Sequence, residues 1–503
     1  MPGKVYLVGA GPGDPGLLTL KGRTILERAD TIIYDYLANA ALLRFARADS
    51  EQICVGKHGG EHKTTQEEIN ELLVARARDG KNVCRLKGGD PYVFGRGAEE
   101  AEALVRAGIS FEVVPGVSSG HAVPAYAGIP VTHRDYASAV TFVTGHEDPA
   151  KAASAVDWSQ LAPARGTLVL FMGVTRLAEI TQSLLDHGRD PETPAAVIRW
   201  GTRSAQEVIT GTLADLASKA AGFKPPAVIV VGEVVGLREK LNWFERLPLF
   251  GKRIVMTRTR EQAGNLREAL LELGAEVIEI PTIEIRDPAS WEPLDSAIRR
   301  LEEFHYLLVT SANGVRNFLA RLKAGGRDVR DLKGLTIGAI GPATAAEFAR
   351  TGIRVDFMPR EYRAEGILEV LGDHELRGKA FLIPRAKVAR DILPQALGER
   401  GARVEVVEAY ETGVPNIPRE ELNRLLTPPP DVVTFTSSST GSNFAKLVGE
   451  ERVADVLRGA AIASIGPITS ETVRKLGLEV TIESDESTIP GLLRAIQSHF
   501  ARP

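Results

Sequence analysis

Short apolar runs alternate with charged, helix-like stretches along the whole chain. The runs KVYLVG, TIIYD, NVCRLKGG and TLVLFMG are followed later by AVIVVGEVV, RIVMTR and DVVTFTS. The runs are rich in Val and Ile and nearly continuous in their apolar character, which is typical of strands buried on both faces of a parallel sheet. The pattern therefore predicts an α/β fold in which helices cover both faces of parallel sheets.

The alternation is interrupted near the middle of the chain. The segment GLREKLNWFERLPLFGKR mixes charged and aromatic residues with a proline, and the strand–helix pattern starts again at Arg253. Because domain boundaries fall in such linkers, we predict an N-terminal domain of residues 1–246 and a C-terminal domain of residues 251–503. A new strand at GIPVTHRDYASAVTFVTGH divides the first domain into sub-lobes of about 1–116 and 117–246.

The C-terminal domain contains an internal repeat. GKRIVMTRTREQAGNLREALLELGAEVIEI resembles GKAFLIPRAKVARDILPQALGERGARVEVV, VTSANGVRNF resembles FTSSSTGSNF, and AIGPATAAEFARTGIRV resembles SIGPITSETVRKLGLEV. The three matches share a nearly constant spacing, which is far longer than the period of a solenoid repeat. The repeat predicts two similar α/β lobes with a cleft between them.

Composition and charge narrow the function classes. A chain of 503 residues is too long for one core, and a net charge of −4 argues against a broad basic face for nucleic acid. We find no charged-then-apolar leader and no long uncharged apolar run, and so expect no membrane segment and a cytoplasmic protein. Cys54 and Cys84 cannot form a disulfide framework, and since both lie in apolar runs we expect them to pack as small hydrophobic residues.

The first strand runs into a glycine-rich turn in VYLVGAGPGDPGLLTLKG. A dinucleotide-binding turn needs glycine at its first, third and sixth positions, and here those positions hold Gly9, Gly11 and Asp14. A carboxylate at the sixth position would face the pyrophosphate, and Pro12 removes one N–H donor. The turn therefore argues against a dinucleotide, and taken alone it fits a strand-to-helix turn without any ligand equally well.

Two further loops change this balance. In RLKGGDPYVFGRG, Gly88 and Gly89 let the backbone approach a ligand closely, and Asp90 offers a carboxylate suited to a ribose hydroxyl or an ammonium group. The loop VVPGVSSGHAVPAYAGIPVTHR adds the hydroxyls of Ser118 and Ser119. Three such loops without a phosphate-binding lysine motif favour a nucleoside without a phosphate chain, as in S-adenosylmethionine.

Residues 4–243 resemble uroporphyrinogen-III C-methyltransferase, a member of the tetrapyrrole methyltransferases. The resemblance is carried in order by the three loops and by ADTIIYDYL, VGKHGG, FVTGH, LFMGV and PAVIVVGEVVGLREKLNW. It implies a fold of two α/β sub-lobes, a homodimer, and methylation of uroporphyrinogen III at C-2 and C-7. The methyl donor would be S-adenosylmethionine, and the products would be precorrin-2 and S-adenosylhomocysteine.

The resemblance also assigns residues to sites. The residues implied to line the S-adenosylmethionine site are Pro12, Gly88, Gly89, Asp90, Val93, Ser118, Ser119, Met172, Gly201 and Ala227. Members of the family often carry Thr-Ala where this chain has Ser118-Ser119, and since serine keeps the hydroxyl we expect binding to survive. Met172 could alternatively pack in the core, and Ala227 could simply fill its strand.

The implied proton acceptor is Asp35 and the implied proton donor is Lys57. An acid/base pair suits a reaction in which a pyrrole carbon attacks the sulfonium methyl and a proton must then move. A strand-end cap for Asp35 and a surface charge for Lys57 are the alternatives. The substrate is a polycarboxylate, so Arg96, His133, Arg134 and Arg203 in or beside the loops are candidates to bind it, although each fits a surface charge equally well.

The C-terminal half has no GxSxG, phosphate loop or His/Cys cluster, and we expect no metal. It does have Ser/Thr- and Gly-rich loops at 310–313, 341–344, 436–440 and 466–470. Helix N-termini after such loops can hold carboxylates, although ordinary N-capping explains most single residues.

Residues 251–496 resemble uroporphyrinogen-III synthase through TSANGV, IGPATA, ARDILP, AYET, FTSSS and IGPITSE. The resemblance implies two lobes joined by a two-strand linker, with crossings near 283–286 and 408–412. Lobe 1 would comprise 251–285 and 412–503, and lobe 2 would comprise 286–411. The implied reaction closes hydroxymethylbilane to uroporphyrinogen III with inversion of ring D.

In this half Tyr410 matches the tyrosine suspected of assisting the loss of water, and packing at the lobe junction is the alternative for it. Ser311, Ser437 and Thr469 are candidates for substrate contact. The C-terminal product would then be the N-terminal substrate, on the way to siroheme or cobalamin.

Two alternatives stay open: a related C-methyltransferase that acts on a later corrinoid precursor, and a C-terminal bilobed tetrapyrrole-binding module that lacks synthase activity. A trifunctional siroheme synthase is disfavoured, because we find no dinucleotide-fingerprint domain in this sequence.

Overall fold

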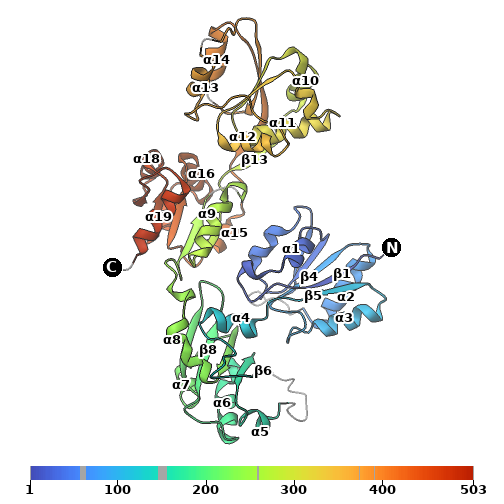
Figure 1. The fold of residues 1–503 in the computed structure, drawn as a ribbon, viewed down its shortest axis with the longest axis vertical. Helices are drawn as coiled ribbons and strands as arrows, with labels where there is room; N and C mark the ends of the chain where they lie inside the picture. Colours follow the sequence, from blue (N-terminus) through green and yellow to red (C-terminus); the bar gives the residue numbers. More distant parts are fainter. Residues whose placement is uncertain are drawn as a thin grey trace. The chain divides into compact units, whose positions relative to one another are not determined.

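The structure is a computed structural model that describes residues 2–56, 64–145, 156–257, 260–372, 374–389 and 391–501 (Figure 1). Helices and strands alternate along these residues, and the strands form four five-stranded sheets. The predicted α/β class is confirmed.

The first sheet is wholly parallel, as predicted, with the order β3-β2-β4-β1-β5. Its strands are β1 (Val5–Gly9), β2 (Thr31–Tyr34), β3 (Glu51–Cys54), β4 (Val83–Lys87) and β5 (Phe111–Val114). The helices between them are α1 (Leu20–Leu26), α2 (Gln66–Arg78) and α3 (Gly97–Arg106). Leu7 and Val8 of β1 enter two different buried clusters, so the sheet is covered on both faces.

The second sheet departs from the prediction of parallel sheets. Its strands, in sheet order, are β6 (Val140–Thr144), β7 (Thr167–Phe171), β10 (Ala227–Val231), β8 (Pro194–Arg199) and β9 (Glu207–Thr212). Only the pair β6–β7 is parallel, while β10 runs antiparallel to β7 and β8, and β9 runs antiparallel to β8.

The physical reason is burial on both faces of this antiparallel sheet. Ile229 and Val230 are neighbours in β10, yet they enter separate buried clusters. The strand is therefore apolar at every position, which is the pattern that predicted a parallel sheet. The nearby helices are α4 (Ser119–Tyr126), α5 (Trp158–Leu161), α6 (Leu177–Asp186), α7 (Leu216–Lys219) and α8 (Arg238–Leu241).

The third and fourth sheets confirm the repeat. The third has the order β12 (Glu276–Glu279), β11 (Arg253–Met256), β18 (Val432–Phe435), β19 (Ala461–Ser464), β20 (Val480–Glu483). The fourth has the order β13 (Glu284–Arg286), β17 (Arg403–Gly413), β16 (Ala380–Ala386), β14 (Tyr306–Val309), β15 (Thr336–Ala339). The strands that carry repeated sequence stand in the same order in both sheets, β12-β11-β18-β19 and β17-β16-β14-β15, so the two lobes are alike.

Helices of this half also occur in matching places, α11 and α16 after the paired TS motifs and α12 and α18 after the paired GP motifs. The bounds are α9 (Arg260–Glu272), α10 (Glu292–Arg299), α11 (Ala312–Ala324), α12 (Pro342–Ala349), α13 (Ala364–Leu371), α14 (Ile392–Glu399), α15 (Arg419–Leu425), α16 (Ser438–Val448), α17 (Val453–Val456), α18 (Pro467–Lys475) and α19 (Ile489–Phe500). Strand β13 pairs antiparallel with the end of β17, from Glu284 with Gly413 to Arg286 with Glu411, where the two-strand linker was expected.

Two sequence expectations concern whole-chain properties. Among the described residues, no helix combines the length and apolar character needed to cross a bilayer. Cys84 is buried, and burial raises the pKa of its thiol to about 12. Cys54 is exposed, contrary to the expectation of packing, because it ends β3 at the edge of the first sheet.

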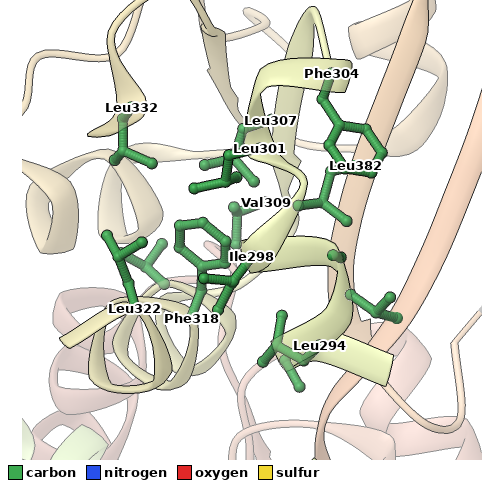
Figure 2. Packing of buried hydrophobic residues seen from close by; sticks show 14 of the residues in the cluster. Leu294, Ile298, Leu301, Phe304, Leu307, Val309, Phe318, Leu322, Leu332 and Leu382 are labelled. Carbon is green, nitrogen blue, oxygen red and sulfur yellow. The ribbon is translucent and has the colours of Figure 1, made fainter. Parts of the chain in front are cut away.

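The core of the fourth sheet is centred on Phe318 of α11. Its side chain is fully buried and points among Ile298, Leu301 and Val309 (Figure 2). This packing joins α10, α11 and β14 into one apolar cluster.

We predict that Phe318→Ala leaves a cavity and lowers the local free energy of opening by about 3–5 kcal/mol. Hydrogen exchange of the β14 and β16 amides in the full chain measures the effect. Val329→Ala is the matched control, because Val329 is exposed in the same lobe. Equal exchange in the two variants would contradict the packing described.

Candidate functional site

Three glycine-bearing loops meet at the carboxyl edge of the first sheet. They follow β1, β4 and β5, which are neighbours in the sheet. A Cβ built on Gly9 would lie 2.4 Å from the Cα of Gly116 and 2.7 Å from the carbonyl oxygen of Gly89. The backbone of Gly11 exchanges two hydrogen bonds with that of Gly89, at 2.7 and 3.2 Å. Only residues without side chains permit this approach, and ligands of parallel sheets bind at this edge.

Asp90 ties two of these loops together. Its Oδ1 accepts hydrogen bonds from the N–H groups of Tyr92 and Val93, and its Oδ2 accepts one from the N–H of Gly116 at 2.9 Å. The carboxylate thus has a structural role that sequence reasoning missed. Oδ2 keeps one lone pair that a ribose hydroxyl could use, and the predicted contact with the ligand stays a prediction.

The third loop continues into α4. Ser118 is buried, and its hydroxyl caps the helix by accepting a hydrogen bond from the N–H of Gly120. Ser119 is half-buried in the first turn. A Cβ on Gly120 would lie 2.6 Å from the ring of Phe171, so the helix packs closely against the end of β7.

The turns that follow β7 and β8 have a strained backbone. Met172, Trp200 and Thr202 are left-handed, with φ of +55°, +48° and +67°. Such values are rare outside glycine and gather at functional sites. Gly201 is buried against Val123, where a Cβ would lie 2.4 Å from a methyl carbon. Met172 is 48% exposed, so the alternative that it packs in the core is wrong.

The remaining residues predicted for this site sit at the margins of the loops. Pro12 and Ala227 are half-buried, and Ala227 is the first residue of β10. Val93 packs against the core of the second sheet. The prediction that they line a ligand is not tested by these positions.

Asp14 connects the first loop to the second sheet. Its Oδ2 accepts a hydrogen bond from the Tyr126 hydroxyl at 2.7 Å, and its N–H donates to the Thr202 hydroxyl at 3.0 Å. Burial and the bond to Asp14 raise the pKa of Tyr126. Asp14, the sixth residue of the turn, therefore forms hydrogen bonds to other parts of the protein with both its side chain and its backbone N–H. The sequence signal for this was Asp-Pro-Gly, an N-cap pattern, and Asp14 does cap a short 3-10 helix by accepting from the N–H of Gly16.

Asp35 follows β2 at the same edge of the sheet. Its Oδ1 accepts from the N–H groups of Leu37 and Ala38, both at 3.2 Å, so the strand-end cap is present. Its Oδ2 lies 3.7 Å from the guanidinium of Arg85, and 27% of the side chain is exposed. The cap uses Oδ1, while Oδ2 faces Arg85. Lys57, its predicted partner, lies outside the described residues.

The four basic candidates differ in what they contact. Arg96 is exposed and forms a two-pronged ion pair with Glu99, at 2.6 and 2.9 Å. Arg203 lies 4.9 Å over the ring of Trp200 and donates to the carbonyl of Leu37 at 3.2 Å, and burial lowers its pKa.

The other two candidates are neighbours in sequence. His133 is half-buried, and its Nδ1 accepts from the N–H of Asp135. Arg134 is exposed. We predict that these two contact a large anionic ligand.

In the C-terminal half the structure brings two of the predicted residues together. The hydroxyl of Tyr410 donates to that of Ser311 at 3.0 Å, and Ser311 also accepts from the N–H of Gly314 as the cap of α11. Tyr410 is 7% exposed and packs in the core of the fourth sheet.

The other two predicted contacts lie near the third sheet. Ser437 caps α16 in a capping box with Thr440, and its hydroxyl lies 3.0 Å from that of Ser439. Thr469 is buried within α18. The capping alternative therefore holds for Ser311 and Ser437. Among the described residues no group of His, Cys, Asp and Glu is placed to hold a metal ion.

Comparisons with known proteins divide the chain in the same way. Residues 4–217 match the family described as Tetrapyrrole (Corrin/Porphyrin) Methylases, and residues 264–494 match the family Uroporphyrinogen-III synthase HemD. Over 98% of its length the chain is 37% identical to the Porphyrin biosynthesis protein HemD of Ruminiclostridium josui, 97% of which is covered.

The N-terminal half has a closer similarity. Over 48% of the chain it is 58% identical to the S-adenosyl-L-methionine-dependent uroporphyrinogen III methyltransferase of Methanosarcina barkeri, 95% of which is covered. A further match is the crystal structure of uroporphyrin-III C-methyltransferase from Thermus thermophilus with S-adenosyl homocysteine, whose sequence is 41% identical. The match covers 47% of this chain and 100% of the other chain, with a TM-score of 0.41.

We predict that Gly9→Ala weakens binding of S-adenosylhomocysteine by about tenfold or more, since the new methyl group forces the three loops apart. Titration calorimetry with the full chain measures this. Gly236→Ala is the matched control, because a Cβ there meets nothing within 4 Å and φ is not positive. Undiminished binding in Gly9→Ala would show that the ligand lies elsewhere.

Proposed function

Because the chain belongs to the tetrapyrrole methylases in its N-terminal half and to the uroporphyrinogen-III synthases in its C-terminal half, we propose that it performs two consecutive steps of tetrapyrrole synthesis. The C-terminal half closes hydroxymethylbilane to uroporphyrinogen III with inversion of ring D. The N-terminal half then methylates uroporphyrinogen III at C-2 and C-7 with S-adenosylmethionine, giving precorrin-2 and S-adenosylhomocysteine. The product of one half is the substrate of the other.

The observation that supports the methyltransferase step most directly is the meeting of the Gly9, Gly89 and Gly116 loops at one sheet edge. Their backbones approach one another with no side chains between them, and Asp90 and Ser118 add an acceptor and a hydroxyl. The described loops carry no phosphate-binding lysine motif. These features fit the nucleoside and amino-acid ends of S-adenosylmethionine, whose sulfonium supplies an electrophilic methyl group.

The protein's part in methyl transfer is to position the two reactants and to accept a proton. A pyrrole carbon forms the new C–C bond as the methyl–sulfur bond breaks, and a proton must then leave the ring system. Asp35 accepts that proton at Oδ2, while Oδ1 stays fixed on the Leu37 and Ala38 amides. Alignment of two reactants in this way can lower the barrier by about 7–11 kcal/mol.

Basic side chains hold the carboxylates of the substrate. His133 and Arg134 make the first contacts. Arg96 and Arg203 use the N–H donors that Glu99 and Leu37 leave free, since a guanidinium has five. Lys57 acts as the proton donor in this scheme.

In the synthase half, Tyr410 and Ser311 assist the departure of water from hydroxymethylbilane. Ser311 accepts from Tyr410 and from Gly314, so its own O–H proton is free to be donated to the leaving oxygen as the C–O bond breaks. Ser437 and Thr469 contact the carboxylates of the folded chain. We also propose the domain limits 1–246 and 251–503, with lobe 2 at 286–411, a homodimer through the N-terminal half, a cytoplasmic location and no nucleic-acid partner.

We predict that the full chain converts hydroxymethylbilane and S-adenosylmethionine to precorrin-2, identified by chromatography and mass spectrometry. Omitting S-adenosylmethionine leaves uroporphyrinogen III. If only the spontaneous isomer uroporphyrinogen I appears, the C-terminal half is a binding module without synthase activity. If uroporphyrinogen III is ignored and a later precorrin is methylated, the N-terminal substrate is wrong.

We predict that Tyr410→Phe and Ser311→Ala each lower the rate of uroporphyrinogen III formation by about a hundredfold, through loss of a positioned proton donor. Tyr306→Phe is the matched control, because Tyr306 stacks on Phe381 in the same sheet. A rate that stays within about twofold of wild type in both site variants would remove this pair from the mechanism.

A further inference from the structure

The first sheet buries a group of charges that the mechanism above does not use. Arg85 and Lys87 lie two residues apart on β4, so their side chains leave the strand on the same face. Glu100 lies on α3, which packs against that face. The exposed fractions of the three residues are 3%, 4% and 0%. Charged residues are almost never buried to this extent unless they are paired.

One carboxylate oxygen organises the group. Oε1 of Glu100 accepts from Arg85 Nε at 3.0 Å, from Lys87 Nζ at 2.8 Å and from the side-chain amide of Gln66 at 3.3 Å. The guanidinium of Arg85 also donates to the carbonyls of Ile33 and Leu86, both at 3.4 Å. Arg85 is therefore held in one orientation by two strands and a helix.

These three residues leave one positive charge in excess. Burying an unbalanced charge is costly, and burial together with the repulsion of Arg85 lowers the pKa of Lys87. Asp35 provides the balancing charge, because its Oδ2 lies 3.7 Å from the second guanidinium nitrogen of Arg85. With Asp35 ionised, two cations face two anions.

Asp35 is the member of the group that reaches the surface. Its side chain is 27% exposed at the end of β2, and its Oδ1 is occupied by the turn that holds Leu37. That turn touches the second glycine loop, since a Cβ on Gly88 would lie 2.7 Å from the Leu37 Cβ. The Tyr36 ring and the Arg203 guanidinium border the same turn. The buried group of charges thus ends at one carboxylate oxygen, Oδ2 of Asp35, beside the glycine loops.

We propose that Arg85, held by Glu100, is a positioning residue that keeps Oδ2 of Asp35 directed to the proton released during methyl transfer. This inference rests on the proposed function. Lys87 supports this arrangement, because its Nζ donates to the same Glu100 oxygen at 2.8 Å. The proton is then returned to solvent, and Asp35 is ready for the second methylation.

The test is the steady-state kinetics of methylation by the full chain, with uroporphyrinogen III and S-adenosylmethionine supplied. In Arg85→Gln kcat falls by about a hundredfold while KM changes by less than about threefold, because the proton acceptor is no longer held toward the reacting atoms. In Arg85→Lys the charge is kept but the fork geometry is lost, and kcat falls by about tenfold.

Arg76→Gln is the matched control. Arg76 forms a two-pronged ion pair with Glu51 in the same sub-lobe, at 2.8 and 2.9 Å, and leaves Asp35 untouched. Its kcat stays at the wild-type value. A kcat of Arg85→Gln within about twofold of wild type, in a variant that still binds S-adenosylhomocysteine, overturns the inference alone. A wild-type chain that transfers no methyl group to any tetrapyrrole overturns the proposed function, and the inference with it.

If Arg85→Gln does not fold, a double-mutant cycle carries the test. Arg85→Lys lowers the rate by about tenfold when Asp35 is present and by less than about twofold in the D35N background. Equal losses in the two backgrounds would mean that Arg85 only supports the fold, and would overturn its role as a positioning residue.

Discussion

The site depends on the approach of three strand ends that only glycine permits. After β1 and β5, any Cβ on Gly9 or Gly116 would overlap the main chain of a neighbouring loop, and after β4 Gly89 adopts a left-handed backbone with φ of +69°. Parallel pairing of these strands sets all three loops on one edge, and the Gly11–Gly89 hydrogen bonds fix their spacing. The edge that we propose to bind the nucleoside consequently presents the main chain of three loops.

Polar ties then connect this edge to the rest of the N-terminal half. Asp90 joins two of the loops, and Asp14 reaches Tyr126 and Thr202 beyond them. Thr202 is one of the left-handed residues, so the strained turn after β8 is anchored to the first loop. The buried Arg85–Glu100 pair supports the turn that contains Asp35, because Arg85 lies beside the Asp35 carboxylate. Rigid support of this kind is what positioning of two reactants requires.

Much of this could be predicted from the sequence, because apolar runs and glycine loops are local signals. The strands, the repeat in the C-terminal half and the three loops were found in this way. The antiparallel pairing of β8, β9 and β10 could not, since helices bury both faces and remove the alternation that marks such strands. The sequence did not predict that Arg85 and Lys87 are buried. Their partner Glu100 lies on another element, and it becomes buried only when α3 packs on the sheet. Lys57 remains a prediction from resemblance.

The central claim is that the glycine loops bind a phosphate-free sulfonium nucleoside. Titration calorimetry of the purified full chain against S-adenosylhomocysteine and against NAD tests it most directly. The account predicts saturable binding of S-adenosylhomocysteine at one site per chain and no heat of binding with NAD. Uptake of NAD by a chain that ignores S-adenosylhomocysteine would contradict it.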